Sequence, residues 1–190
     1  MNILKRVKFT NTKEKTNYNN TFILGKDETL LPKFTRIFGT KYSVNIYYLR
    51  TEKPELNLTE NCINIHLPMN YRKRNNQDLL NVILFKMYTK IAENEIENIM
   101  EKARHTFGFA PEDYEIKRMA STLANCDKDT QSISINPYLV MYSKEIVEYV
   151  VFHQFCHLKY KTHTKKFYDM LKKYVPNYET LARQLPNLKY

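Results

Sequence analysis

Three histidines near the C-terminal end of the sequence have the spacing of a metal site. His153 and His157 are four residues apart, so on a helix they lie one turn apart on one face, where two imidazoles can bind one ion. The pair matches the zinc motif H-E-x-x-H, except that Gln154 occupies the glutamate position. A catalytic zinc ion needs three protein ligands and one open position. A third ligand must therefore come from another part of the chain.

His163 is the candidate third ligand. It follows His157 by six residues, and on an unbroken helix the two side chains would point about 240° apart. A break at residues 161–162, followed by a new helix that Thr162 or Thr164 caps, would bring the ring of His163 back over the first helix. The sequence therefore predicts zinc bound by three histidines.

A second interpretation of the histidine pair needs no metal. Ile146 and Val150 precede the pair on the same helical stripe and are apolar, so this face of the helix should be buried. Two histidines there could be packed, hydrogen-bonded core residues. The third histidine and the new helix after it favour the metal site. Cys156, between the two histidines, is expected to be a small core residue rather than a ligand or a nucleophile.

Gln154 bears on catalysis rather than on metal binding. In a peptidase with this motif the glutamate takes a proton from the attacking water, and general-base help of this kind is worth roughly 10²–10⁴ in rate. A glutamine has the same shape and can donate a hydrogen bond, but its amide is not a useful base. Metal binding should survive while turnover collapses. Engineered inactivation and a naturally inactive enzyme both explain this residue, and the sequence leaves both open.

Composition limits the class of protein and its location. The 190 residues are 43% hydrophobic, which is enough for a globular core, and no apolar run is as long as a membrane span. Cys62, Cys126 and Cys156 are widely spaced, which predicts no disulfide framework and a reducing compartment. Charges interrupt the first eight residues, so we expect no secretory signal. The expected protein is cytoplasmic, with no membrane partner.

The net charge of +10 raises the question of nucleic acid. Thirty lysine and arginine residues support a weak association with an anionic surface. The charges are spread along the chain, and an ordinary solvated surface explains them equally well. We therefore expect at most a weak, secondary association with nucleic acid.

Two helices should position the histidines. Apolar residues recur at three- and four-residue intervals from Asp78 to Phe107, where Gly108 ends the predicted helix. Ser143 can cap the histidine-bearing helix, against which the long helix should pack. Four acidic residues of the long helix are expected to form its solvent-exposed face: Glu93, Glu95, Glu97 and Glu101.

The predicted strands complete an α+β fold. Val44–Leu49 and Cys62–Leu67 alternate in polarity and are predicted to form a hairpin with a long polar connection. Tyr114–Met119 and Ser132–Asn136 are predicted to be strands joined by a turn at residues 127–129. We expect a small antiparallel sheet packed on the long helix and on an active-site helix.

This order of parts resembles the YgjP-like metallopeptidase family, a relative of the SprT-like and WLM zincins. The resemblance runs from about Val44 to Leu185, and its most specific portions are Ile133–Val140, Glu145–His153 and the segments that carry His157 and His163. The resemblance implies a zincin-like fold, a zinc cofactor held by three histidines at positions 153, 157 and 163, and a general base at position 154.

Two departures from the family accompany this resemblance. The family's Arg-Met-Lys-Ser-Arg-Trp-Gly-Ser-Cys segment corresponds to Arg118–Cys126, where both the second arginine and the tryptophan are missing. Features of the substrate cleft that the family builds from this arginine and tryptophan are therefore not expected here. The other departure is Gln154, where the family has glutamate.

These observations lead to one functional hypothesis with two rivals. We expect residues 1–43 to be an N-terminal extension of unknown role and residues 44–190 to be a zinc-dependent metallopeptidase domain, inactivated here by Gln154, with a protein or peptide substrate. The first rival is a catalytically silent, zinc-containing module that binds peptide or nucleic acid. The second is a metal-dependent hydrolase of a non-peptide substrate such as a nucleotide.

Overall fold

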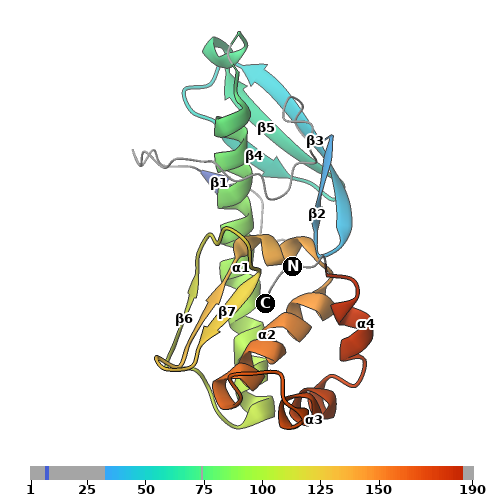
Figure 1. The fold of residues 1–190 in the computed structure, drawn as a ribbon. Coiled ribbons are helices and arrows are strands. Elements are labelled where there is room, and N and C mark those ends of the chain that lie inside the picture. Colours follow the sequence, from blue (N-terminus) through green and yellow to red (C-terminus); the bar gives the residue numbers. More distant parts are fainter. Residues whose placement is uncertain (1–6, 9–32, 74, 186–190) are drawn as a thin grey trace. The chain divides into compact units, whose positions relative to one another are not determined.

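The computed structural model describes residues 7–8, 33–73 and 75–185 and confirms the α+β class (Figure 1). Its helices and strands belong to two compact units, residues 1–87 and residues 88–190. The boundary between the units falls inside the longest helix, α1 (Gln77–Phe107).

The N-terminal unit contains a five-stranded sheet with the strand order β1-β4-β5-β3-β2. The strands β2 and β3 form a hairpin. Its turn residues, Phe38 and Gly39, have φ angles of 48° and 79°, and a type I′ turn requires positive φ at both positions. A short helix, η1 (Met69–Tyr71), follows the sheet. The strands are β1 (Val7–Lys8), β2 (Phe34–Ile37), β3 (Thr40–Leu49), β4 (Glu55–Leu58) and β5 (Cys62–Pro68).

The hairpin predicted from Val44–Leu49 and Cys62–Leu67 is wrong. The strands that contain these segments, β3 and β5, are neighbours but run parallel. The connection between them contains a further strand, β4, which pairs antiparallel with β5. Because β4 runs antiparallel to β3, the next strand, β5, again runs in the same direction as β3, and it lies between β3 and β4 in the sheet.

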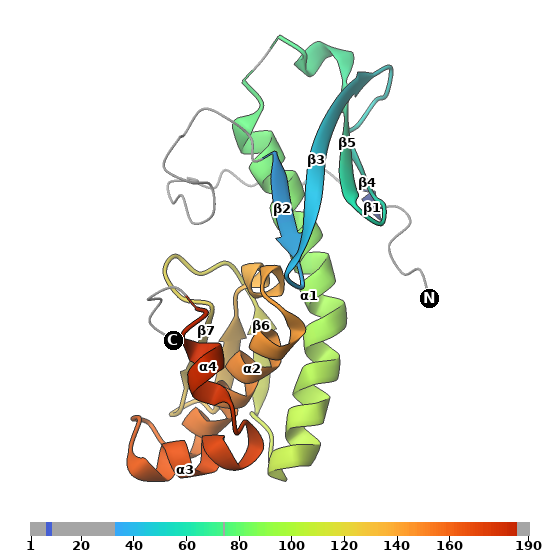
Figure 2. The ribbon, with the colours of Figure 1, turned by 90° about the vertical axis from the view of Figure 1, so that its right-hand side faces the viewer.

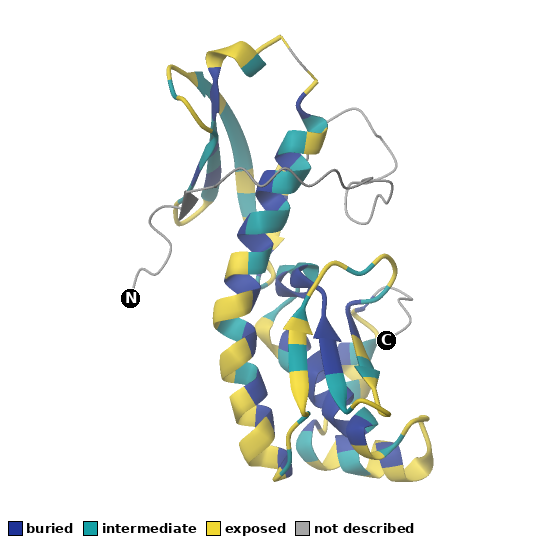
Figure 3. Ribbon diagram, turned by 90° about the vertical axis from the view of Figure 1, so that its left-hand side faces the viewer, coloured by how far each residue is buried: buried dark blue, intermediate teal, exposed yellow. Residues whose placement is uncertain are grey.

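The strands of this sheet bury alternate side chains. Leu56, Ile63, Ile65 and Leu67 are each at most 1% exposed, whereas the residues between them are half-buried. Figure 3 colours these strands by burial. Because successive side chains of a strand point to opposite faces, the alternation gives the sheet one apolar face and one face that water reaches.

The C-terminal unit contains a three-stranded sheet and most of the helices. Its strands are β6 (Asp113–Ile116), β7 (Ala124–Asp127) and β8 (Ser132–Ile135), in the order β6-β8-β7. After β8 come η2 (Pro137–Met141), α2 (Lys144–Lys159), α3 (Lys165–Tyr174) and α4 (Tyr178–Ala182), which Figure 2 shows from a second side.

The expected arrangement of this second strand pair is also wrong. The strands from residue 114 and from residue 132 are parallel neighbours, β6 and β8, and are not joined by one turn. The polar turn instead joins β8 to β7, a strand that the sequence analysis missed. Both sheets therefore mix parallel and antiparallel pairs, and the expectation of an antiparallel sheet is corrected.

The long helix agrees closely with its prediction. It ends before Gly108, whose φ is +73° and whose N–H donates to the Arg104 carbonyl at 3.0 Å. Phe107 packs against Phe152 and Phe155 of α2, with ring centroids 5.2 and 5.4 Å apart, so the predicted contact between the two helices is confirmed. Among the described residues, no helix is long and apolar enough to cross a membrane.

Three of the four acidic residues predicted to form the solvent-exposed face of α1 are exposed. Glu93, Glu97 and Glu101 are exposed, while Glu95 is half-buried and accepts from Lys144 at 3.1 Å. The expected boundary between residues 43 and 44 stays a prediction, and most of the segment before it lies outside the described residues.

Candidate metal centre

Two local caps and one break build the loop that carries the third histidine. The Ser143 hydroxyl accepts from the Ile146 N–H at 3.4 Å and begins α2, as predicted. The helix ends at Lys159, and Tyr160 is extended. The Thr164 hydroxyl then accepts from the Phe167 N–H at 3.4 Å and begins α3. Thr164, rather than Thr162, is therefore the cap of the new helix.

This break brings the three histidines together. The Nε2 atom of His153 lies 3.1 Å from that of His157 and 3.0 Å from that of His163, and the last two Nε2 atoms are 3.1 Å apart. His153 is buried, His157 is half-buried and His163 is exposed, so the cluster reaches from the core to the surface. Of the histidines, cysteines and acidic residues that the structure describes, these three form the group able to hold a metal ion.

Hydrogen bonds alone do not account for this triangle. An imidazole Nε2 either carries a proton and donates or has a lone pair and accepts, so three nitrogens in mutual contact cannot all be paired. A cation that accepts three lone pairs satisfies every one of them. Tetrahedral zinc with Zn–N distances of about 2.0–2.1 Å separates its nitrogen ligands by about 3.3 Å. The observed separations of 3.0–3.1 Å fit such an ion with a small adjustment.

The surroundings keep the histidines neutral, which is the form that binds a metal. Burial, with a smaller contribution from the two neighbouring imidazoles, lowers the pKa of His153 to about 2. Burial also lowers the pKa values of His157 and His163. The Tyr160 carbonyl lies 3.1 Å from Nδ1 of His157 and can only accept, so Nδ1 carries the proton and Nε2 keeps its lone pair.

Phe167 supports all three rings from one side. Its ring centroid lies 4.9, 4.8 and 4.6 Å from those of His153, His157 and His163, and its side chain is fully buried. The sequence analysis did not give Phe167 or the Tyr160 carbonyl a place in the site. An aromatic residue in the first turn of the new helix was the available signal for Phe167, whereas a backbone carbonyl gives none.

Gln154, which follows His153 in the sequence, is buried inside the protein. It is 1% exposed, and among the described residues its Nε2 has no hydrogen-bond partner. Buried amides normally have partners, so an unpaired one calls for a ligand, an ion or water that completes it. Cys156 is fully buried, and burial raises the pKa of its thiol to about 12, which agrees with a packed residue rather than a thiolate ligand.

Asn136 fixes the segment that differs from the family pattern. Its side-chain amide donates to the carbonyls of Met119 and Thr122, both at 3.0 Å, and its oxygen accepts from the Tyr138 N–H at 3.3 Å. Asn136 is completely buried, and its side chain holds the connection from β6 to β7 at two points and η2 at a third. The sequence analysis took this residue only as the end of a strand.

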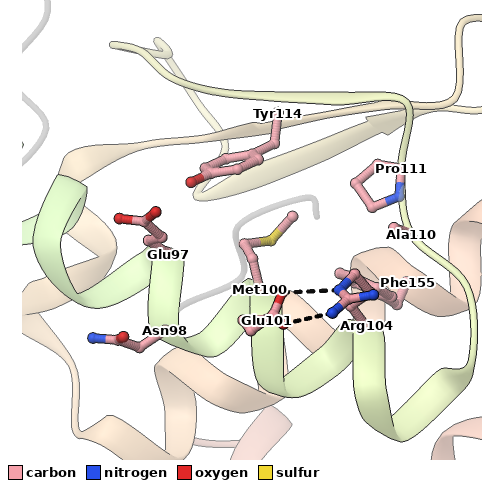
Figure 4. A pocket seen from close by; sticks show the side chains of 9 residues that line it. All are labelled: Glu97, Asn98, Met100, Glu101, Arg104, Ala110, Pro111, Tyr114 and Phe155. Atoms are coloured by element: carbon pink, nitrogen blue, oxygen red, sulfur yellow. Dashed lines mark hydrogen bonds and ion pairs between the residues drawn. The ribbon is translucent and has the colours of Figure 1, made fainter.

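The lining of a cavity of about 430 Å³, drawn in Figure 4, contains none of the three histidines. Its lining comes mainly from α1 and residues 110–114, and Phe155 is the only contributor from α2. Glu101, on its rim, pairs with Arg104 at 2.6 Å, and the hydrogen bond from Arg104 lowers the pKa of this carboxyl to about 2. The cavity therefore adds no group to the metal centre.

Comparison with known proteins places the chain in a family. The zymogens of two metallopeptidases are among the similar solved structures: abylysin from Pyrococcus abyssi, at 20% identity, and jannalysin from Methanocaldococcus jannaschii, at 24% identity. Each alignment covers 47% of this chain, with 90% and 94% of the other chain and TM-scores of 0.44 and 0.41. No curated protein gives a match. The family match, by contrast, extends over residues 8–188, and the chain therefore belongs to the YgjP-like metallopeptidase family.

Proposed function

We propose that this protein is a zinc peptidase in fold and metal binding whose turnover is suppressed by Gln154. Membership of a metallopeptidase family implies a catalytic metal, and the histidine cluster can hold one. The observation that carries the proposal is the triangle of Nε2 atoms at 3.0–3.1 Å. Three imidazole ligands, with a fourth position left for water or substrate, are the ligand set of a catalytic zinc site.

Each histidine has a distinct part in this proposal. His153 is held in the core and remains neutral, while the Tyr160 carbonyl orients His157. His163 closes the site from the solvent side, where a substrate can enter. A zinc ion bound there supplies a Lewis acid that polarises a carbonyl group and activates water.

Gln154 can orient a substrate or a water molecule but cannot remove a proton. Its amide does not ionise near neutral pH, and its buried Nε2 is a donor without a described partner. A glutamate at this position would accept a proton and return it to the leaving amine. We infer that the chain keeps its affinity for the metal and for substrate while the chemical step is slow.

The proposal includes a substrate class and a location. The substrate is a protein or peptide, because that is the substrate class of the family. The three cysteines are free, which suits a reducing compartment such as the cytoplasm. We also propose that the protein is related to the SprT-like zincins.

Restoring the general base is the decisive experiment. Gln154→Glu should raise peptide hydrolysis roughly 10²–10⁴-fold, because the new carboxylate can accept the proton, and zinc content should stay unchanged. The measurement combines cleavage of a fluorogenic peptide library with elemental analysis of both proteins. Gln154→Asn is the matched control, since it changes the side chain without adding a base.

The same experiment separates the proposal from its rivals. A silent binding module, which Gln154 itself favours, predicts that the glutamate variant binds zinc yet cleaves nothing. A nucleotide hydrolase predicts phosphate release from nucleoside triphosphates and no peptide cleavage. Either result would overturn the peptidase assignment for this chain.

A further inference from the structure

The N-terminal unit presents a second surface that the metallopeptidase chemistry does not use. The register of its sheet places alternate residues of β2, β3, β4 and β5 on one side, because Cα partners on neighbouring strands share a face. We call this side the open sheet face. Its principal residues are Phe34, Arg36, Lys41, Asn45, Tyr47 and Asn64.

Two large aromatic side chains are exposed on this face. Tyr47 on β3 is 46% exposed and Phe34 on β2 is 43% exposed. Phe34 pairs with Ser43, four residues before Tyr47, so strand geometry separates the two rings by roughly 14 Å. Exposed rings of this kind offer flat surfaces on which the rings of a ligand can stack.

The groups between the aromatics are amides. Asn45, Asn57 and Asn64 lie in one row across three strands, and the Asn45 amide donates to the Asn64 side-chain oxygen at 3.0 Å. The next row holds His66, whose ring lies 5.6 Å from that of Tyr47. Side-chain amides can donate to and accept from the edges of nucleic-acid bases.

Basic residues lie at the end of the face near Phe34. Arg36 and Lys41 are paired in register, and the Lys41 ammonium lies 3.8 Å from the centre of the Phe34 ring. Glu55 is the acidic residue among the strand positions of this face. Charge is also uneven along the chain: residues 1–87 contain 15 lysines and arginines against 7 acidic residues, and residues 88–190 contain 15 against 13.

We propose that the open sheet face binds single-stranded nucleic acid. Tyr47 and Phe34 would stack on bases, the asparagine row would contact base edges, and Arg36 and Lys41 would bind phosphates. Single strands fit better than duplexes, because exposed rings need unstacked bases as partners. The inference is independent of the proposed peptidase function, since the residues that carry it belong to the other unit.

Fluorescence anisotropy of the full-length chain with labelled polyuridine RNA of about 12 nucleotides tests this proposal. Tyr47→Ala should weaken binding about 5- to 100-fold through the loss of one stacked base, whereas Tyr47→Phe should bind like the parent. Phe34→Ala is a second stacking variant that keeps the test valid if Tyr47→Ala misfolds. Circular dichroism and urea denaturation show that each variant remains folded.

Charge variants supply the second arm of the test. Arg36→Gln with Lys41→Gln should lower the slope of log Kd against log salt by about 1.4, as expected for two lost contacts to a single strand. Lys166→Gln with Lys172→Gln removes the same charge from exposed positions of the other unit and should change this slope much less. The proposal is overturned if no oligonucleotide binds, if a duplex binds as tightly, if Tyr47→Ala and Phe34→Ala bind like the parent, or if both charge pairs act alike.

Discussion

The two units use polar side chains in opposite ways. In the C-terminal unit the innermost polar groups of the site are buried, since His153 is 3% exposed and Gln154 is 1% exposed, and of the three histidines only His163 is exposed. In the N-terminal unit the polar and aromatic groups stand on a sheet face that water reaches, and this part of the chain carries most of the net positive charge. The same protein thus combines a metal site anchored in the core with polar and aromatic groups on an open sheet face.

This difference follows from what each surface would bind. A metal ion needs three nitrogens held within a few tenths of an ångström, which requires ligands on packed helices with neighbours that restrict their rings. A flexible polymer needs flat rings and charges spread over a wider area. Changes at buried positions should therefore strongly alter metal content or the free energy of unfolding, and changes at exposed positions should alter these two quantities little.

The largest expected effect is the loss of metal. His153→Ala removes the innermost ligand, so zinc content should fall from about one ion per chain to a small fraction, since two histidines remain. Elemental analysis after gel filtration measures this. His105→Ala is the matched control, because His105 lies on the exposed end of α1 and should leave the metal in place. Full zinc retention in His153→Ala would contradict the three-histidine site.

A pair of phenylalanines compares the two units directly. Phe167→Ala should destabilise the protein by about 3–5 kcal/mol, because the side chain is fully buried and supports three histidine rings. Phe34→Ala should change the free energy of unfolding by only about 0.5 kcal/mol, because Phe34 is 43% exposed. Urea denaturation measures both. Equal losses would remove the contrast between enclosed and open aromatic residues.

Acid should destabilise the metal-free chain through its C-terminal unit. The pKa of His153 is lowered from 6.5 to about 2 in the folded chain, so between these values the unfolded chain binds a proton that the folded chain does not. The contribution of neutral His153 to the free energy of unfolding is therefore fully present above about pH 6.5. It declines as the pH falls further, by about 2 kcal/mol between about pH 7 and pH 5. Urea denaturation in the presence of a chelator measures this loss, and His153→Asn should reduce it. A flat profile in the parent would exclude a buried neutral histidine.

The smallest expected effect concerns the cap that begins α3. Thr164→Ala removes the acceptor of the Phe167 N–H and should cost about 1 kcal/mol. Thr162→Ala is the control, because Thr162 accepts from the Thr164 N–H through its backbone carbonyl, which alanine keeps. Thermal unfolding compares the two variants. A larger loss in Thr162→Ala would reassign the cap.

Local features were predictable from the sequence, and long-range ones were not. The ends of α1 and α2 depend on Gly108 and Ser143, which act on residues within one turn, and both were predicted. The strands β4 and β7 were missed because each has four residues and lies in a polar stretch between stronger strands. Without them, the parallel pairing of β3 with β5 and of β6 with β8 could not be derived.

For the metal centre, the sequence by itself determined which residue types are present, their spacing on α2 and the absence of a carboxylate at position 154. The tertiary structure alone decided that His163 returns to within 3.1 Å of its partners, that Phe167 supports the rings and that the Tyr160 carbonyl fixes one tautomer. The physical reason is range. Periodicity and caps arise from contacts between residues three or four positions apart, whereas ring orientation and desolvation depend on residues that meet only when the chain is packed.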